Sequence, residues 1–481
     1  PFEADQTRGC LVKLHGISVL MNEPSAPLCQ DLQESYESVA PSERKTKRHA
    51  RGTLSWVCIT SYQLIYSMIT TSFALSILPQ EAERLNSADT SLWLAAYVMI
   101  CGATQLICPL AGLLSDRLSS RFGRRRPMML LASLVAAAGF LSLYFCSRYN
   151  FPHPFLFSLA FTETSLNVAY AAHAALPADL RVTESDVESQ GSEAEADAGL
   201  ISGIMALHSF LGAVLAVAIM DVAKGFPLYV FYQFYGLGVV VICFLVSCVA
   251  KEEPSTNLSF PTRGEIAAAY TMDRERDMDF GWVCYGRLLF YTSQSVIVFM
   301  AYFIRDMFQV HSEDAVMAKL STLVLIGQLL GGAVAVPSSR LSDIVGCKPM
   351  VYISCVLQCI TFLIFCVAPL FGWLVMLIGA CFYGFGAGSY MSVDYALALK
   401  CLPSNKDRAQ SFGLWGIAGF IGSCLGPLVT GGVLWIFPGD DVASLHAPEY
   451  QYKGYVFGML LAGSIPALGV IPATKQIIRR V

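Results

Sequence analysis

Long apolar runs separated by short polar connections make up most of this chain. A helix rises about 1.5 Å per residue and needs ~20 mostly apolar residues to cross the hydrocarbon of a bilayer. Runs of that length occur at approximately 53–79, 92–114, 127–148, 154–177, 199–221, 226–250, 281–308, 316–338, 349–369, 371–400, 410–437 and 453–474. The pattern predicts an all-α membrane protein of twelve transmembrane helices.

The composition supports this prediction and excludes several classes of protein. Of the 481 residues, 55% are hydrophobic and only 14% are charged, against roughly 25% charged in soluble domains. The net charge of -4 leaves no basic face for nucleic acid. We therefore expect a lipid bilayer, and no nucleic acid, around this chain.

The sixteen cysteines do not predict disulfides or a metal site. Nearly all of them lie inside the apolar runs, where a thiol acts as a small hydrophobic group. Cys355 and Cys359 share a helical face but have no nearby histidine or further cysteine to complete four ligands. The sequence also contains no phosphate-binding loop and no nucleophile constellation. We expect neither an enzyme nor a bound metal or cofactor.

An even number of spans places both ends of the chain on one side of the membrane. Most of the 32 lysines and arginines lie on that side, so the positive-inside rule predicts cytoplasmic termini. Which membrane holds the protein does not follow from the sequence. The predicted organisation is an N-terminal tail (1–52), a six-helix bundle (53–250), a cytoplasmic linker (251–280), a second six-helix bundle (281–475) and a C-terminus (476–481).

The two halves repeat one pattern. The connection after the second run reads "GLLSDRLSSRFGRRRPM", and that after the eighth reads "SSRLSDIVGCKPM", which places Asp116 and Asp343 at matching positions. "ALP" at 175–177 and "CLP" at 401–403 follow at almost the same offset. Halves with six spans each have the same orientation, as in one large class of secondary transporters.

The first of these connections resembles the signature loop of the major facilitator superfamily. The resemblance rests on one glycine, an Asp-Arg pair and a second glycine followed by bases: Gly112, Asp116, Arg117, Gly123, Arg124, Arg125 and Arg126. The longer form ending in "RFGRRRP", with "ALPADL" and "VDYALALKCLP", resembles the sucrose and glycoside-cation symporter branch. It implies a transporter of two pseudo-symmetric six-helix bundles that works by alternating access.

The same resemblance implies a role for this loop in gating. Asp116, Arg117 and the arginines at 124–126 are expected to latch the cytoplasmic side in the outward-facing state, and Asp343 with Lys348 to form a weaker second latch. An aspartate at a helix end can pair with bases and face the positive N-terminus of a neighbouring helix. The alternative is that the arginines only anchor the topology.

Glu163 lies near the middle of the predicted span 154–177. Asn167, Tyr170 and His173 continue its helical face. Ionisable groups inside a membrane are costly and are functional candidates by default. We hypothesise that Glu163 binds the coupling proton and that His173 assists; a structural hydrogen bond is the alternative for each.

Two further charges lie inside spans of the second half. Arg287 shares a face with Tyr291 and Gln294, and Asp394 lies six residues before Lys400. Arg287 either snorkels to the membrane surface or lines a cavity, and in the second case it has Glu163 or Asp394 as a partner.

The remaining polar candidates are phenols and amides of the first span, Tyr62, Gln63 and Tyr66. Such groups suit a neutral polyhydroxylated small molecule. The predicted function is secondary active transport of a sugar or glycoside by alternating access, with proton symport. Two alternatives stay open: a carrier of an organic ion or amphiphile, and a non-cycling sensor or structural subunit of a membrane complex.

Overall fold

The computed structural model describes residues 10–14, 17–21, 52–85, 90–185, 191–222, 225–252, 261–272, 277–310, 312–402, 408–437 and 450–478. It separates into two units, 1–50 and 51–481. The first contains an antiparallel hairpin that the sequence analysis did not predict, β1 (Cys10–Leu14) with β2 (Ile17–Met21). Most of the predicted tail 1–52, parts of the linker 251–280, the second "CLP" motif from Pro403 and the last three residues lie outside the described residues.

Six helical runs form the first half of the second unit. Two of them change helix type along their length. They are α2 (Thr53–Thr60) with α3 (Tyr62–Ser72), the π-helix η1 (Phe73–Ile77) and α4 (Leu78–Leu85); α5 (Thr90–Ala103) with the 3₁₀ turn η2 (Thr104–Ile107) and α6 (Cys108–Arg117); α7 (Arg125–Arg148); α8 (Pro152–Ser185); α9 (Gly191–Val222); and α10 (Leu228–Val249).

After the short helix α11 (Arg263–Ala268), six more runs follow. They are α12 (Met278–Gln294) with η3 (Ser295–Phe299) and α13 (Met300–Met307); α14 (Glu313–Val345); α15 (Cys347–Phe371); α16 (Trp373–Lys400); α17 (Arg408–Ile436); and α18 (Tyr452–Ile465) with η4 (Pro466–Val470) and α19 (Ile471–Lys475). The prediction of an all-α, twelve-helix membrane architecture is confirmed for this unit.

Ten of the described runs are long and apolar enough to cross a membrane. The other two predicted spans are the run 53–85 and α8, which is 34 residues long. Both are of spanning length but carry more polar side chains, among them Gln63, Glu81, Glu163 and Asn167. These two helices carry many of the candidate site residues.

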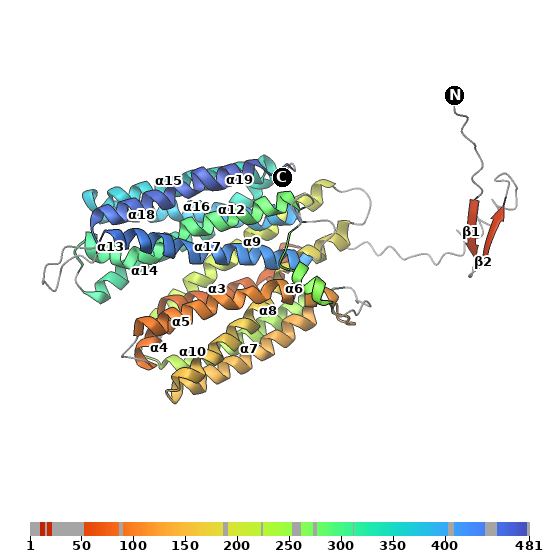
Figure 1. Cartoon of the computed structure of the whole chain (residues 1–481), viewed down its shortest axis with the longest axis horizontal. Coiled ribbons are helices and arrows are strands. Elements are labelled where there is room, and N and C mark those ends of the chain that lie inside the picture. The colour runs from red at the N-terminus through yellow and green to blue at the C-terminus, as the bar shows by residue number, and fades with distance from the viewer. Residues whose placement is uncertain are drawn as a thin grey trace, which may run out of the picture. The chain divides into compact units, whose positions relative to one another are not determined.

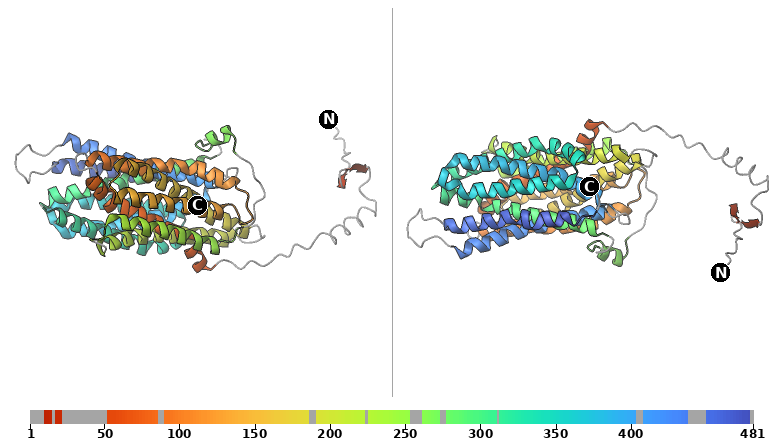
Figure 2. Two further views of the ribbon diagram at one scale, coloured as in Figure 1. Left: turned by 90° about the horizontal axis from the view of Figure 1, so that it is seen from below. Right: turned by 90° about the horizontal axis from the view of Figure 1, so that it is seen from above.

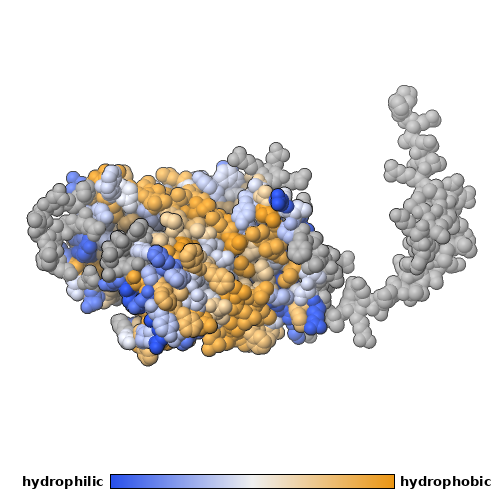
Figure 3. All heavy atoms as spheres, turned by 60° about the horizontal axis from the view of Figure 1, so that its bottom comes forward, coloured by the Kyte–Doolittle hydropathy of each residue, from blue (hydrophilic) through white to orange (hydrophobic). Residues whose placement is uncertain are grey.

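The helices run side by side, the first half grouped on one side and the second half on the other (Figures 1 and 2). On the face seen in Figure 3, a broad band of apolar side chains covers the bundle between two more polar ends. We call the end where α6 finishes and α17 begins the Asp116 face, and the end with α4 and α13 the opposite face. Toward the opposite face the two groups splay apart (Figure 1).

Tight connections at two glycines separate consecutive long helices of the second half. Gly346 (φ 92°) lies between α14 and α15, and Gly372 (φ 96°) lies between α15 and α16. Left-handed backbone is accessible to glycine at little cost because it has no Cβ. Each glycine allows the chain to reverse direction within one residue.

The two halves meet through α6 against α17 and through α9 against α14. Both contacts depend on glycines. A Cβ at Gly112 of α6 would lie 2.3 Å from the carbonyl oxygen of Ala409, and one at Gly413 would lie 2.5 Å from Cα of Pro109. On the other side a Cβ at Gly203 would lie 2.2 Å from Oγ of Ser339. Small residues let membrane helices approach backbone to backbone, so the halves are in close contact near the Asp116 face.

We predict that Gly413→Ala forces α6 and α17 apart, because the new methyl group would collide with backbone rather than with a movable side chain. Overpacking of this kind costs about 1–3 kcal/mol. Amide hydrogen exchange should become faster at the end of α6 and the start of α17. Gly416→Ala is the matched control, since no atom lies within 4 Å of that site; equal exchange in the two variants would contradict the prediction.

Candidate functional site

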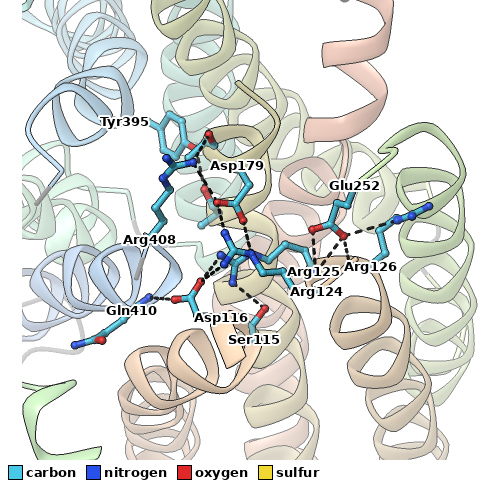
Figure 4. A network of polar contacts seen from close by, with 12 residues as sticks. Ser115, Asp116, Arg124, Arg125, Arg126, Asp179, Glu252, Tyr395, Arg408 and Gln410 are labelled. Atoms are coloured by element: carbon cyan, nitrogen blue, oxygen red, sulfur yellow. Dashed lines mark hydrogen bonds and ion pairs between the residues drawn. The ribbon is translucent and has the colours of Figure 1, made fainter. Parts of the chain in front are cut away.

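Arg125 is the centre of a charged network at the Asp116 face (Figure 4). Its fully buried guanidinium donates to Oγ of Ser115 at 3.0 Å, to Asp179 at 2.7 Å and to Asp116. Arg124 donates to the same Asp179 at 3.0 Å. A buried ion pair compensates for its desolvation only when the remaining hydrogen-bonding groups are also satisfied. The network meets this condition by sharing two carboxylates among several donors.

The same two carboxylates connect this half to the second half. Asp116 accepts the backbone N–H of Gln410 at 3.3 Å, in the first turn of α17, where the helix dipole favours negative charge. Arg408 donates to the carbonyl of Ala178 at 3.0 Å and to Asp179 at 3.4 Å. The network therefore holds α6, α7 and α8 against the N-terminus of α17.

Two uncharged contacts reinforce this junction a turn deeper. The hydroxyl of Tyr395 donates to the carbonyl of Ala174 at 2.7 Å, and the N–H of Ala396 donates to Oγ of Ser202 at 3.1 Å. Both connect α16 of the second half to helices of the first. The Asp116 face is closed by several independent bonds between the halves.

Glu252 holds the start of α7 from outside the helix. It accepts the backbone N–H groups of Arg125 at 3.1 Å and Arg126 at 2.9 Å, which have no partner within the helix. Burial raises the pKa of Glu252, and these two N–H bonds oppose that rise. Gly123 (φ 90°) passes so close that a Cβ there would lie 2.3 Å from the Glu252 side chain, which explains the second signature glycine.

The linker helix α11 lies over the junction of α6 and α17. Arg117 forms an ion pair of 2.7 Å with Glu265, and Nε2 of Gln410 donates to the carbonyl of Ala268 at 3.3 Å. Hydrogen bonds with Thr262 in a capping box, and then the charge of Arg117, hold the pKa of Glu265 below its usual value. Arg117 thus contacts the linker, whereas Arg124 and Arg125 contact Asp116 and Asp179.

The second copy of the loop has a different arrangement. The Asp343 carboxylate lies against α9, where a Cβ at Gly199 would be 2.2 Å from Oδ1. Lys348 donates to the carbonyl of Ile477 at 2.6 Å. Lys348 therefore holds the C-terminal segment, and the site of Asp343 on α9 matches that of Asp116 on α17.

Glu163 lies near the middle of α8, about 17 Å from its start at 1.5 Å per residue. Its side chain is 3% exposed and has no hydrogen bond or ion pair with any described residue. Beside it, Tyr66 donates to Oδ1 of Asn167 at 2.8 Å, and Asn167 donates to Oγ1 of Thr104 at 3.1 Å. Tyr66 also stacks on Tyr170 with ring centroids 4.8 Å apart.

Other predicted residues of the first half occupy the same region. Tyr62 donates to the carbonyl of Leu166 at 2.8 Å, and its ring centre lies 5.2 Å from that of His173. Gln63 donates to Oγ of Ser209 at 2.8 Å, while its buried Oε1 has no partner among the described residues. The structure therefore brings the predicted polar residues of α3 and α8 together.

Arg287 pairs with Asp394 rather than with Glu163. Its guanidinium carbon lies 3.5 Å from the ring centre of Trp415 and 4.6 Å from that of Tyr291. Trp415 also donates to Asp394 at 3.4 Å. Arg287 is 7% exposed, so it does not snorkel to the surface. Its Nε, like Oε1 of Gln294, is buried with no partner in the described part of the chain.

A cavity of about 870 Å³ lies between the halves toward the opposite face. Its walls come from the run 71–80, from α9 at 216–222 and from α14 at 314–325. The helix pair α9 and α14 is thus in tight contact near the Asp116 face and separated near the opposite face. Tyr170 of the first half lies within electrostatic reach of Arg287 and Tyr291 of the second, so the two polar clusters face one another.

Comparison with known proteins identifies the family of this chain. The sequence matches the family described as Major Facilitator Superfamily over residues 55–427 and 283–471. The chain belongs to the major facilitator superfamily. Membership of this family indicates a membrane transporter and not an enzyme, as the sequence predicted. A comparison with curated protein sequences finds no match.

Several solved superfamily structures share the fold at low sequence identity. The human organic anion transporter MFSD10 (TETRAN) is 17% identical, with a TM-score of 0.61 over 87% of this chain and 100% of that one. A bacterial homologue of the iron transporter ferroportin, in an outward-facing state, is 12% identical, with a TM-score of 0.65 over 88% and 99%. A variant of the E. coli fucose:proton symporter FucP is 14% identical, with a TM-score of 0.58 over 89% and 100%. At these identities the likeness concerns the fold.

Several residues of the charged network and of the Arg287 site were not predicted from the sequence. Asp179 and Arg408 join the charged network, and Trp415 covers Arg287. Asp179 lies in the "ALPADL" segment that carries the resemblance to a branch, but nothing in its spacing indicates its partners. Gln358 is fully buried with neither amide atom bonded to a described residue, and it gave no sequence signal.

We predict that Asp394→Asn destabilises the protein by about 3–5 kcal/mol, because it leaves the buried guanidinium of Arg287 uncompensated. The double variant Asp394→Asn with Arg287→Gln should regain much of that stability, since the pair is removed as a unit. Thermal unfolding in detergent measures both. A double variant no more stable than Asp394→Asn would show that the pairing is not the cause.

Proposed function

We propose that this protein is a proton-coupled carrier of a small neutral polyhydroxylated solute, a sugar or glycoside, and that it works by alternating access. The observation that carries the proposal is the unpaired carboxyl group of Glu163. Three buried acids each pair with an arginine: Glu81 with Arg84, Asp116 with Arg125, and Asp394 with Arg287. Glu163 has no such partner among the described residues.

An unpaired buried carboxyl group suits a proton-binding role. Burial without a partner disfavours the charged form of a carboxyl group, and access of water favours it again. A group that alternates between these environments takes up a proton on one side and releases it on the other. Glu163 lies beside the phenol of Tyr66, within the polar cluster that faces the second half, so its protonation would be coupled to solute occupancy.

The pairing of the buried charged side chains supports a neutral solute. Arg287 is compensated by Asp394 and covered by Trp415, so it is not available to recruit an anion. The hydrogen-bonding groups that lack a described partner include Oε1 of Gln63, Oε1 of Gln294 and Nε of Arg287. Two amide acceptors and one donor, with surrounding phenols, match a ligand rich in hydroxyl groups.

The rival substrate classes fit these groups less well. An organic anion would require Arg287 to exchange its Asp394 partner for the substrate. A non-cycling subunit would have no use for an unpaired buried Glu163, whose retention costs stability. "RFGRRRP", "ALPADL" and "VDYALALKCLP" support placing the chain near the sucrose and glycoside-cation symporters.

The closed Asp116 face and the cavity toward the opposite face together support an outward-facing state. We propose that the Asp116 face is cytoplasmic, with both termini on that side, in keeping with the excess of lysine and arginine there. Asp116, Asp179 and Arg125 then form the principal latch, and Asp343 on α9 forms the second. The two six-helix halves, 53–250 and 281–475, would rock against one another, and α6 would part from α17 when the Asp116 face opens.

If this latch is correct, Asp116→Asn should shift the protein toward the inward-facing state, because it removes the charge that holds Arg125 and the N-terminus of α17. Amide exchange should rise at the Asp116 face and fall around 71–80, 216–222 and 314–325. Glu83→Gln is the control, since Glu83 is an exposed acid near the opposite face. Unchanged exchange at both faces in Asp116→Asn would remove the latch from the mechanism.

The central test is uptake by purified protein in liposomes, with a panel of sugars and glycosides and with or without an imposed pH gradient. The parent should show gradient-stimulated uptake. Glu163→Gln should keep solute exchange but lose stimulation, because the amide binds no proton, whereas Glu83→Gln should behave as the parent does. Stimulation that survives in Glu163→Gln would refute the coupling role. Absence of flux for every sugar, with the protein folded, would refute the substrate class.

A further inference from the structure

Another buried group without a full set of partners is His173, ten residues after Glu163 on α8. It is 0% exposed. Its Nε2 lies 3.2 Å from the carbonyl oxygen of Ile59, while its Nδ1 has no partner in the described part of the chain. Since a carbonyl oxygen only accepts, Nε2 carries the hydrogen, and this assignment leaves a bare lone pair on Nδ1 of the neutral ring.

His173 lies part-way along α8 from Glu163 to the Asp116 face. At 1.5 Å per residue, His173 lies about 15 Å along α8 from Glu163 and about 9 Å from Asp179. It therefore lies between the central carboxyl group and the network that closes the Asp116 face. An unsatisfied acceptor in a buried site is destabilising, so a purely structural histidine would be expected to have a donor here.

The interval between Glu163 and His173 contains hydrogen-bonding groups from several helices. Tyr66 bonds Asn167, and the ring of Tyr62 lies 6.1 Å from that of Tyr66 and 5.2 Å from that of His173. These fixed dipoles form a polar path in an otherwise apolar helix packing. Such a path can hold water molecules that carry a proton between two acceptors.

The titratable groups around His173 are few. Tyr62 approaches from α3, His208 from α9, and Tyr395 from α16 through its bond to Ala174. His208 has a partner for its own Nδ1, the hydroxyl of Thr60 at 3.1 Å. Toward the Asp116 face the next charges are Asp179 and Arg125, which are already paired. Within α8, His173 is the described titratable group between Glu163 and Asp179 whose ring presents an open proton-accepting atom.

We propose that His173 is the release-side proton relay of the carrier, an inference that rests on the proposed coupling through Glu163. The O–H bond of Glu163 breaks, a proton passes along intervening water, and an N–H bond forms at Nδ1 of His173. Glu163 becomes a carboxylate and His173 an imidazolium ion. When the Asp116 face opens, the Nδ1 proton passes to bulk water and the neutral ring is restored. Histidine suits this step because its neutral ring has one nitrogen that donates a hydrogen and one that can accept a proton.

The test compares His173→Gln with His208→Asn in liposomes. Glutamine retains a donor for the carbonyl of Ile59 but does not titrate, and asparagine retains a partner for Thr60. Solute exchange requires no net proton release, so both variants should exchange as the parent does. Gradient-driven net uptake should fall about a hundredfold in His173→Gln, the lower end of what a positioned proton-transfer group contributes, and should persist in His208→Asn. Parent-like net uptake in His173→Gln would overturn the relay.

A measurement on the parent protein covers the case in which His173→Gln fails to fold. With a proton acceptor on the release side, net uptake should fall as the internal pH is lowered at a constant pH difference across the membrane, while exchange stays constant. Net uptake that stays flat as the internal pH is lowered would overturn the relay. Coupling that survives in Glu163→Gln would refute the proposed function itself. Loss of coupling in Glu163→Gln with full coupling in His173→Gln would refute the relay alone.

Discussion

The cost of placing charge in a low-dielectric interior governs the polar residues of this structure. Buried carboxylates at the two ends and in the second half are matched by arginines, and their remaining lone pairs accept N–H or O–H groups. Removing one member of such a pair leaves an uncompensated charge, which costs far more than the pair contributes. Glu163 and the Nδ1 atom of His173, both on α8, are buried groups without such partners among the described residues, and a functional role would explain them.

Close approach of the two halves is the second requirement, and it determines where the charges can act. Asp116 reaches the N–H of Gln410 because glycines at 112 and 413 let α6 and α17 touch at the backbone. Asp343 reaches α9 because position 199 is glycine. The proposed latch therefore depends first on backbone geometry and second on charge. A larger side chain at any of these glycines would separate the groups that must pair.

Much of the fold could be predicted from the sequence, because the length of an apolar run directly reports a membrane span. The signature glycines and Asp116 also follow from local pattern, and the structure explains each of them by a contact. Pairings between distant residues could not be predicted in the same way. Nothing in the spacing of Arg287 distinguishes Asp394 from Glu163 as its partner, and the roles of Asp179, Arg408 and Trp415 depend on helix packing that no single segment encodes.

The two repeats divide their work unequally, and the difference has a physical basis. In the first repeat Asp116 shares Arg125 with Asp179, and Arg408 extends the network to the second half. In the second repeat the loop sequence carries fewer basic residues, and Lys348 is directed to the carbonyl of Ile477. A network that shares charges over four helices must break as a unit, whereas the contact on α9 can be lost alone. Opening of the Asp116 face would then be limited by the α6 and α17 junction, and the α9 and α14 junction would act as the hinge side.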